Sequence, residues 1–286
     1  MDKDVEIFQI HCGYVNGYHL RSKNKIQKGV VVTFGGSEGG CYYDMAEHIA
    51  QNGFEVLALY YFGKYNQPST LSNVPIEFFS EIINYIDQYC ISQKPLTVIA
   101  ASRGAELAGV LAEYYSEINN LILFAPSAYR FQGANCFCEL PAWTYNEEAL
   151  PYIHSNSASI WEKNKLSIQC VLHLPIRQLS YNDSTIKNTM DLEKTRIKFE
   201  LFKGRVLIFL GQDDGLWNSD RMSKVIQSEF HKQENFKIIA YPNVGHAFSE
   251  GRISGKYFIG GSKEANLAAL KDSNQKVIEA LLTWHV

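Results

Sequence analysis

Ser102 lies in a run of residues whose order suits a nucleophilic serine. The apolar segment 98–101 leads directly into Ser102, Arg103 and Gly104, and a second apolar segment follows. A serine hydroxyl is a weak nucleophile, so enzymes hold it on a sharp strand-to-helix turn beside a base and backbone donors. Small residues must flank such a serine, and Ala100 and Gly104 fill these positions. We therefore predict that Ser102 attacks an acyl carbon.

Two further kinds of catalytic side chain follow Ser102 along the chain. Asp213 and Asp214 come after an apolar segment that ends at Gly211, and His246 follows the last apolar segment on a Gly-His turn. Serine, then acid, then histidine is the order found in α/β-hydrolases. In such a triad the histidine takes the serine proton, and the acid orients the imidazole. We predict Asp214 as the acid, with Asp213 as the alternative or as a cap for the turn.

The glycine-rich segment 35–40 is the expected source of a backbone donor. Negative charge develops on the substrate oxygen during attack, and two backbone N–H groups should face it. One is expected from Arg103, the residue after the nucleophile, and the other from Ser37 in this segment. Glycines before a helix also bind phosphates, but the segment lacks the Gly-Lys-Ser/Thr and Gly-x-Gly-x-x-Gly patterns of nucleotide sites.

Short apolar segments alternate with amphipathic ones through most of the chain, which predicts a largely parallel sheet with helices on both faces. The carboxyl edge of such a sheet is the expected place for chemistry. The clearest helix is expected at 75–91, with Pro75 in its first turn. Segment 5–18 is expected to be an antiparallel hairpin that turns at Asn16-Gly17. The expected core strands are 29–34, 55–60, 96–101, 121–125, 205–210 and 236–241.

Residues 126–203 interrupt this alternation, because they are too long for one crossover helix and have weak periodicity. Connections of this length usually carry function. We expect residues 1–286 to form a single α/β-hydrolase domain in which 126–203 is a lid or cap insertion over the carboxyl edge. A peripheral decoration is the alternative.

The composition favours a small-molecule partner. A formal net charge of -3 over 286 residues implies no broad attraction to nucleic acid or to an anionic membrane. The charged start and the absence of a long apolar run predict a cytoplasmic protein without a signal peptide or a membrane span. No metal and no organic cofactor are expected. Reduced thiols are expected at the six scattered cysteines, Cys12, Cys41, Cys90, Cys136, Cys138 and Cys170.

Six segments of the chain carry a resemblance to a known family. They are GGSEGG (35–40), GFEVLALYYF (53–62), VPIEFF (74–79), ASRGAEL (101–107), GQDDGLW (211–217) and YPNVGH (241–246). In this order, and covering most of the chain from Gly29 onward, they resemble the catalytic domain of the acyl-CoA thioesterase and bile acid-CoA:amino acid N-acyltransferase family. The resemblance implies an α/β-hydrolase domain with Ser102, Asp214 and His246 as its triad, acting on thioesters or related acyl substrates.

The sequence also departs from this family. Animal members carry an N-terminal β-sandwich, which is expected to be absent here because the first core strand begins near Gly29. The N-acyltransferases of the family use cysteine as nucleophile, so Ser102 favours water as the acceptor. A carboxylesterase, lactonase or peptidase with the same triad, an acyl-CoA:amine N-acyltransferase and a non-catalytic binding protein remain alternatives. A basic group in the insertion would suit the phosphates of CoA: Lys163, Lys165, Arg177, Lys187, Lys194, Arg196 and Lys198.

Overall fold

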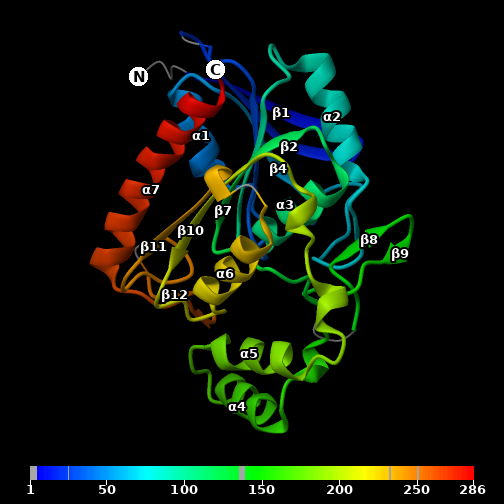
Figure 1. The fold of residues 1–286 in the computed structure, drawn as a ribbon, viewed down its shortest axis with the longest axis vertical. Helices are drawn as coiled ribbons and strands as arrows, with labels where there is room; N and C mark the ends of the chain where they lie inside the picture. The colour runs from blue at the N-terminus through cyan, green and yellow to red at the C-terminus, as the bar shows by residue number, and fades with distance from the viewer. Residues whose placement is uncertain (1–4, 25, 135–138, 232, 250) are drawn as a thin grey trace.

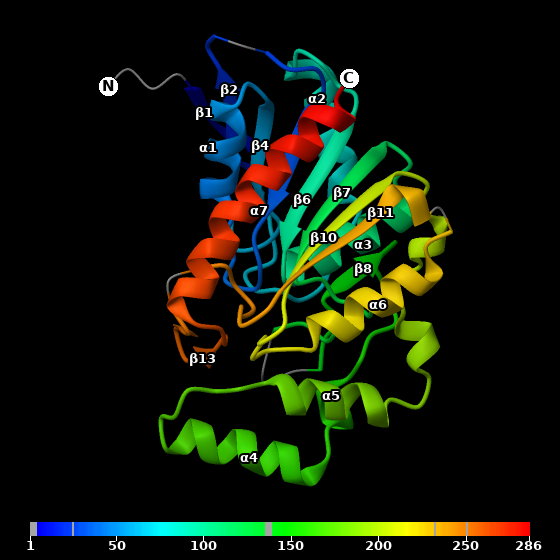
Figure 2. The ribbon, with the colours of Figure 1, turned by 60° about the vertical axis from the view of Figure 1, so that its left-hand side comes forward.

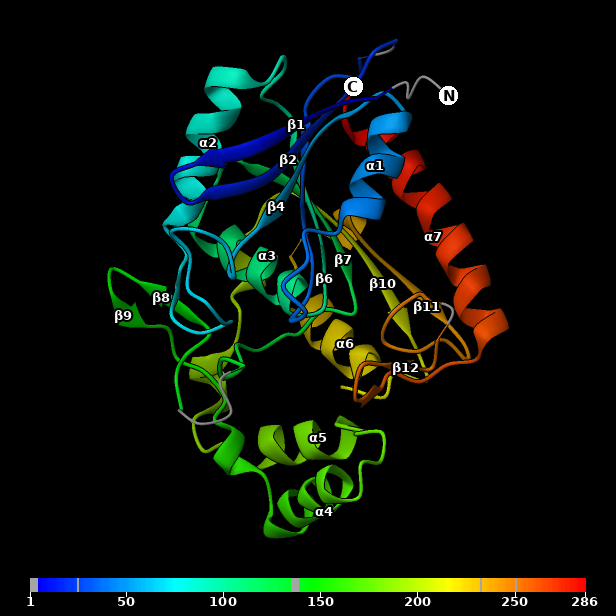
Figure 3. The ribbon, with the colours of Figure 1, turned by 180° about the vertical axis from the view of Figure 1, so that it is seen from behind.

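An eight-stranded sheet forms the centre of the protein in the computed structural model, which describes residues 5–24, 26–134, 139–231, 233–249 and 251–286. Its strands are β1 (Val5–Cys12), β2 (Val15–Ser22), β3 (Val30–Phe34), β4 (Glu55–Tyr60), β6 (Leu96–Ala101), β7 (Ile118–Phe124), β10 (Arg205–Gly211) and β11 (Phe236–Tyr241). They are ordered β1-β2-β4-β3-β6-β7-β10-β11. Neighbouring strands are parallel except at one edge, where β2 runs antiparallel to both β1 and β4 (Figure 3). The six expected core strands are confirmed.

Helices cover both faces of this sheet, as the alternating pattern predicts (Figures 1 and 2). Apolar residues of the first and last helices pack with one face in a single core, and those of the other three pack with the opposite face. The α/β-hydrolase fold class is therefore confirmed. The first pair is α1 (Tyr43–Gln51) and α7 (Lys263–Trp284), and the second group is α2 (Phe78–Tyr89), α3 (Arg103–Tyr114) and α6 (Ser219–Glu229).

The N-terminal hairpin is present, but the expected position of its turn is wrong. Cys12 pairs with Val15, so Gly13 and the residue after it make the two-residue turn, and Gly13 has φ 58°. Asn16 and Gly17 instead lie inside β2. A Cβ atom at Gly17 would lie 2.0 Å from the carbonyl oxygen of Ala58 on β4. Gly17 therefore serves the close approach of two strands, a tertiary requirement that a local turn signal does not reveal.

The helix expected at 75–91 begins three residues later, at Phe78. Val74 and Pro75 form the short strand β5 (Val74–Pro75), which pairs with β8 (Trp143–Tyr145), and β8 pairs in turn with β9 (Glu148–Ala149). The N–H groups of Val74 and Ile76 donate to carbonyls of the insertion. These hydrogen bonds hold the chain extended where its sequence favours a first helical turn.

The insertion 126–203 also contains two helices, α4 (Ile160–Val171) and α5 (Leu179–Asn188). Both views in Figures 1 and 2 draw α5 beyond the ends of β10 and α6, with α4 as the outermost layer. Within the described residues, no helix is both long and apolar enough to cross a bilayer. The remaining short elements are η1 (Ser155–Ser157), η2 (Leu192–Thr195), η3 (Phe199–Leu201), η4 (Gln233–Asn235), β12 (Ile253–Ser254) and β13 (Tyr257–Phe258).

A buried carboxylate ties the antiparallel edge to the parallel sheet. Glu55 on β4 accepts hydrogen bonds from His19 Nε2 at 2.8 Å, from Arg21 Nε at 3.1 Å and from the N–H of Ile91 at 2.8 Å. Burial alone would raise the pKa of the Glu55 carboxyl. The hydrogen bonds and the neighbouring positive charge outweigh burial, so the pKa of Glu55 is lowered.

Replacing Glu55 with glutamine is expected to lower the free energy of unfolding by about 3 kcal/mol, because it breaks a buried charge pair. Because folding lowers the pKa of Glu55, its contribution is complete above the ordinary pKa and is lost as pH falls through the lowered value. Urea unfolding at neutral and stepwise lower pH should show the wild-type and Glu55→Gln curves converging below about pH 4.5. The exposed Glu148→Gln variant is the control, and equal losses in both variants would contradict this account.

Candidate active site

The structure brings the three residues expected to form the triad into one hydrogen-bonded chain. Ser102 follows β6, Asp214 follows β10 and His246 follows β11, so the parallel sheet delivers all three to its carboxyl edge. His246 Nε2 lies 2.8 Å from Ser102 Oγ, and His246 Nδ1 lies 2.8 Å from Asp214 Oδ2. Asp214 and His246 are both buried. The geometry allows a proton to pass from the serine to an imidazole that a carboxylate stabilises.

Ser102 lies on a sharp turn between β6 and α3. Its backbone has φ 55° and ψ -120°, a conformation that side-chain-bearing residues rarely adopt. A Cβ atom at Gly104 would lie 2.0 Å from the Gly35 carbonyl oxygen, and one at Gly36 would lie 3.2 Å from Ser102 Cβ. Only glycine fits at position 104, because the glycine-rich loop packs directly against the start of α3.

The carboxylates of the two neighbouring aspartates have different partners. Asp214 accepts hydrogen bonds from the Ser219 hydroxyl and from the N–H groups of Leu216 and Trp217, in addition to its contact with His246. Asp213 instead accepts from the N–H of Gly261 at 3.0 Å and lies beside Arg177. This arrangement agrees with the preference for Asp214 as the acid and with a turn-capping place for Asp213.

In the glycine-rich loop, the backbone N–H of Ser37 is free within the described part of the chain, and Ser37 lines the same cavity as Ser102. Within the loop, the N–H of Gly35 donates to the Gly40 carbonyl, and the N–H of Gly36 donates to Glu38 Oε1 at 2.7 Å. Among the residues that the structure describes, no atom accepts a hydrogen bond from the backbone N–H of Ser37. The same is true of the backbone N–H of Arg103, at the start of α3. Free N–H groups of this kind can stabilise an oxyanion.

Tyr61 fixes the peptide that carries the Ser37 N–H, a contact that the sequence analysis missed. The Tyr61 hydroxyl donates to the Gly36 carbonyl at 2.8 Å, and this carbonyl belongs to the same peptide unit as the Ser37 N–H. Burial raises the pKa of Tyr61 well above its ordinary value, so the hydroxyl keeps its proton. Tyr61 is in turn held by the Tyr14 hydroxyl, which donates to its carbonyl oxygen.

Replacing Tyr61 with phenylalanine is expected to lower kcat about ten-fold while leaving KM nearly unchanged, because a mobile donor stabilises the transition state less well. Steady-state kinetics on any substrate that the wild type turns over would measure this split. Tyr152→Phe is the control, because the Tyr152 hydroxyl donates to the Glu139 carbonyl, outside the glycine-rich loop. A rise in KM with unchanged kcat would contradict a positioning role for Tyr61.

A cavity of about 410 Å³ opens beside Ser102 and His246. Most of its remaining wall comes from the insertion 126–203, which contributes both apolar and polar side chains. Representative wall residues are Phe131, Ile153, Leu166, Tyr181, Asn182 and Thr185. Trp217, just after the acid, also lines the cavity, and its ring meets the His246 ring edge to face.

The side chain of Arg103 fixes part of this wall. Arg103 Nη1 lies 2.9 Å from Glu106 Oε2, and Arg103 Nη2 donates to the carbonyls of Phe131 and Gln132 at 3.1 Å each. Burial raises the pKa of the Glu106 carboxyl, and the Arg103 charge opposes that rise. The residue after Ser102 therefore supplies a candidate backbone donor and also orients the first turn of the insertion.

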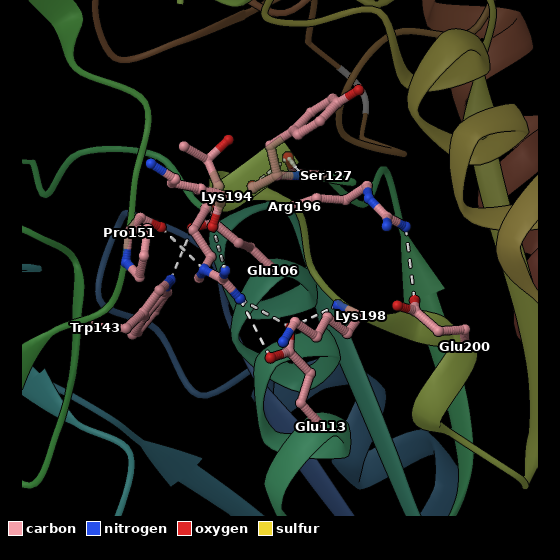
Figure 4. Close-up of polar contacts among 12 residues, drawn as sticks. Glu106, Glu113, Ser127, Trp143, Pro151, Lys194, Arg196, Lys198 and Glu200 are labelled. Atoms are coloured by element: carbon pink, nitrogen blue, oxygen red, sulfur yellow. Dashed lines mark hydrogen bonds and ion pairs between the residues drawn. The ribbon is translucent and has the colours of Figure 1, made fainter. Parts of the chain in front are cut away.

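Two glutamates of α3 anchor the base of the insertion (Figure 4). Trp143 Nε1 donates to Glu106 Oε1 at 2.7 Å. Glu113 accepts from Arg130 Nη1 at 2.9 Å and from the N–H of Lys198 at 2.6 Å. The helix that begins at the candidate nucleophile thus holds both ends of the insertion.

One cluster of potential metal ligands occurs among the described residues, at His19, Glu55 and Cys90. It lies at the antiparallel edge of the sheet, and Arg21 occupies the same Glu55 oxygen that contacts His19. This cation and the hydrogen bonds to Glu55 fit a structural role. The four cysteines within the described residues are free thiols, whereas Cys136 and Cys138 lie outside those residues.

The basic residues of the insertion that the sequence analysis associated with CoA are mostly paired. Lys194 contacts Asp191, Lys165 contacts Glu162, and Arg196 contacts three glutamates. Arg177 lies beside Asp213 and precedes Gln178, which lines the cavity. Arg177 therefore adjoins the cavity along the chain, as does Lys165, which precedes the cavity-lining Leu166.

A serine on a strand-to-helix turn, an acid after a later strand and a histidine after the last strand define the α/β-hydrolase superfamily. The chain belongs to the family described as BAAT / acyl-CoA thioester hydrolase C terminal, whose family model matches residues 74–250. It is 25% identical over 265 residues to acyl-coenzyme A thioesterase 6 of Homo sapiens, covering 87% of this chain and 58% of that protein.

Two further similarities extend this comparison. The chain is 26% identical to acyl-coenzyme A amino acid N-acyltransferase 1 of Mus musculus, covering 83% of this chain and 53% of that protein. It therefore spans little more than half the length of these relatives. Among solved structures, an esterase of Pyrococcus furiosus matches with a TM-score of 0.61 at 13% identity, over 100% of this chain and 94% of that one. This likeness concerns the fold.

Proposed function

We propose that this chain hydrolyses an acyl thioester of the acyl-CoA type, or a related ester, through a covalent acyl-enzyme. The observation that carries the proposal is the continuous hydrogen-bonded chain from Ser102 through His246 to Asp214. Membership of a family described by acyl-CoA thioester hydrolysis supports the thioester as the bond that is cleaved. The N-acyltransferase among the relatives makes transfer to an amine the second candidate.

In the proposed mechanism, Ser102 Oγ attacks the acyl carbon while His246 Nε2 takes the serine proton. The backbone N–H groups of Ser37 and Arg103 stabilise the negative charge on the acyl oxygen. Collapse of this intermediate breaks the bond to the leaving thiol or alcohol, which receives the proton from His246. Water then attacks the acyl-enzyme with His246 as its base, and the free acid leaves. Asp214 orients the imidazole and stabilises its charged form throughout.

The insertion 126–203 is proposed to act as a lid that shapes the acyl pocket within a single domain. Its contribution to most of the cavity wall supports this role. The anchoring of its base by Glu106 and Glu113 keeps Phe131 and Gln132 beside the nucleophile. We propose that Arg177, beside the cavity-lining Gln178, meets the polar end of the leaving group.

The proposal is tested by offering the wild type a panel of acyl-CoA thioesters and p-nitrophenyl esters of graded chain length. The Ser102→Ala variant serves as the blank for non-enzymatic cleavage. Thioester cleavage above this blank supports the thioesterase assignment and gives the preferred chain length. Cleavage of esters alone would keep the proposed chemistry but exclude the thioester as substrate. Adding an amino acid and assaying for the amide product tests transfer to an amine.

A further inference from the structure

Helix α4 turns its apolar side to solvent, the reverse of the usual arrangement in a globular protein. None of its residues is buried. Ile160, Trp161 and Val171 are 77%, 74% and 75% exposed, and Ile168 and Leu172 are also exposed. Counted from Ile160, these positions are i, i+1, i+8, i+11 and i+12, so they share one face of the helix. We call these five residues the α4 stripe.

The opposite side of α4 faces the rest of the protein through mainly polar contacts. Glu162 accepts from the Ser180 hydroxyl of α5 at 2.7 Å, and the Ser159 N–H donates to Ser184 Oγ at 2.9 Å. Leu166 is the residue of α4 that lines the cavity beside Ser102. The helix is thus held in place by its inward side. Figure 2 draws α4 as the outermost helix of the insertion, and the residues of the α4 stripe are exposed.

The area and the charges of this surface limit the kind of partner that fits it. A twelve-residue helix presents a face of roughly 18 Å by 10 Å, or about 200 Å². A stable protein partner usually requires about 800 Å² on each side. Lys163 and Lys165 lie on the two flanks of the stripe, where Lys163 donates to the Asn156 carbonyl and Lys165 contacts Ser180 and Glu162. The exposed Trp161 lies within the stripe. An apolar stripe with a tryptophan and flanking lysines is typical of helices that lie in the surface of an anionic bilayer.

We infer that the α4 stripe docks onto the surface of an anionic lipid bilayer, where Lys163 and Lys165 exchange their contacts within the insertion for lipid headgroups. This inference rests on the proposed function for its purpose, because acyl substrates are amphiphiles that gather at such surfaces. Docking would bring the lid, and with it the cavity behind Leu166, close to lipid. The weak net charge of the chain does not oppose this contact, because the two lysines act locally.

Flotation with vesicles of phosphatidylcholine, with or without phosphatidylglycerol, tests the inference. The Ser102→Ala variant of the 286-residue chain is used, so binding is measured without turnover and the result is independent of the proposed function. We expect binding that phosphatidylglycerol strengthens, and a loss of about ten-fold or more in the partition coefficient on replacing Ile168 and Val171 with asparagine. Tyr65→Asn, an equally exposed aromatic outside the lid, is the control and should bind as before.

Trp161 supplies a second readout. Its fluorescence should shift to the blue on the vesicles, and Trp161→Phe should remove that shift while keeping most of the binding. Binding that is unchanged in the Ile168→Asn, Val171→Asn double variant would overturn the inference. Absence of vesicle binding by the wild-type chain would also overturn it. If that chain also forms a dimer that the double variant loses, the stripe is instead an interface between two copies.

Discussion

Replacing Ser102 with alanine is expected to reduce kcat by about 10³- to 10⁶-fold with little change in thermal stability. The alanine removes the only atom that forms the proposed covalent bond, whereas the turn and the hydrogen-bonded pair of Asp214 and His246 remain. Initial rates on the best substrate of the panel, with melting temperatures for both proteins, measure the effect. Ser228→Ala on α6 is the matched control, because that hydroxyl only donates to its own helix. Ser102→Ala activity within ten-fold of wild type would contradict the nucleophile assignment.

The second large effect is expected at Asp214. Asp214→Asn should lower kcat by about 10³- to 10⁴-fold, because the amide cannot hold the His246 tautomer that accepts the serine proton. Asp213→Asn should change kcat less than about three-fold, because an amide oxygen still accepts from the Gly261 N–H. The pair is a matched test, since the two aspartates are neighbours in the chain. Parallel measurement of kcat for both variants checks it, and the reverse order of effects would move the acid role to Asp213.

The position of the candidate site could be predicted because each of its three side chains comes shortly after the end of a strand. Parallel strands bring their carboxyl ends to one edge of the sheet. Correct strand boundaries were therefore enough to predict that Ser102, Asp214 and His246 lie together. The six strand predictions were accurate since buried parallel strands are short, apolar and rich in β-branched residues. The order of serine, acid and histidine along the chain then predicted which catalytic role each residue has.

Features that depend on contacts between distant segments could not be predicted in this way. The local sequence around Gly17 is typical of a turn, but Gly17 lies within a strand because the Ala58 carbonyl of the neighbouring strand leaves no room for a side chain. Tyr61 follows an apolar strand and resembles a core residue in the sequence. Its hydrogen bond to the peptide that carries the Ser37 N–H forms only because the glycine-rich loop folds back onto it. Pro75 likewise fits a helical first turn until the insertion supplies a strand to pair with it.

Helix α4 shows a different limit of sequence patterns. Ile160, Ile168 and Val171 share one face of this helix, although the insertion as a whole has weak periodicity in the sequence. The usual interpretation turns such a face toward a core. In the structure, Glu162 and Ser180 hold the opposite side inward, so the apolar face is exposed. Periodicity identifies the apolar face of a helix. Whether that face points to the core or to solvent depends on the polar contacts of the opposite face.

The central claim is that His246 activates Ser102 to form a covalent acyl-enzyme. Reaction with a fluorophosphonate, followed by mass spectrometry of the intact protein and its peptides, tests this claim without knowledge of the substrate. We predict one adduct per chain, located on Ser102, and loss of labelling in the His246→Ala variant. Labelling of another residue, or equal labelling of Ser102 without His246, would contradict the account.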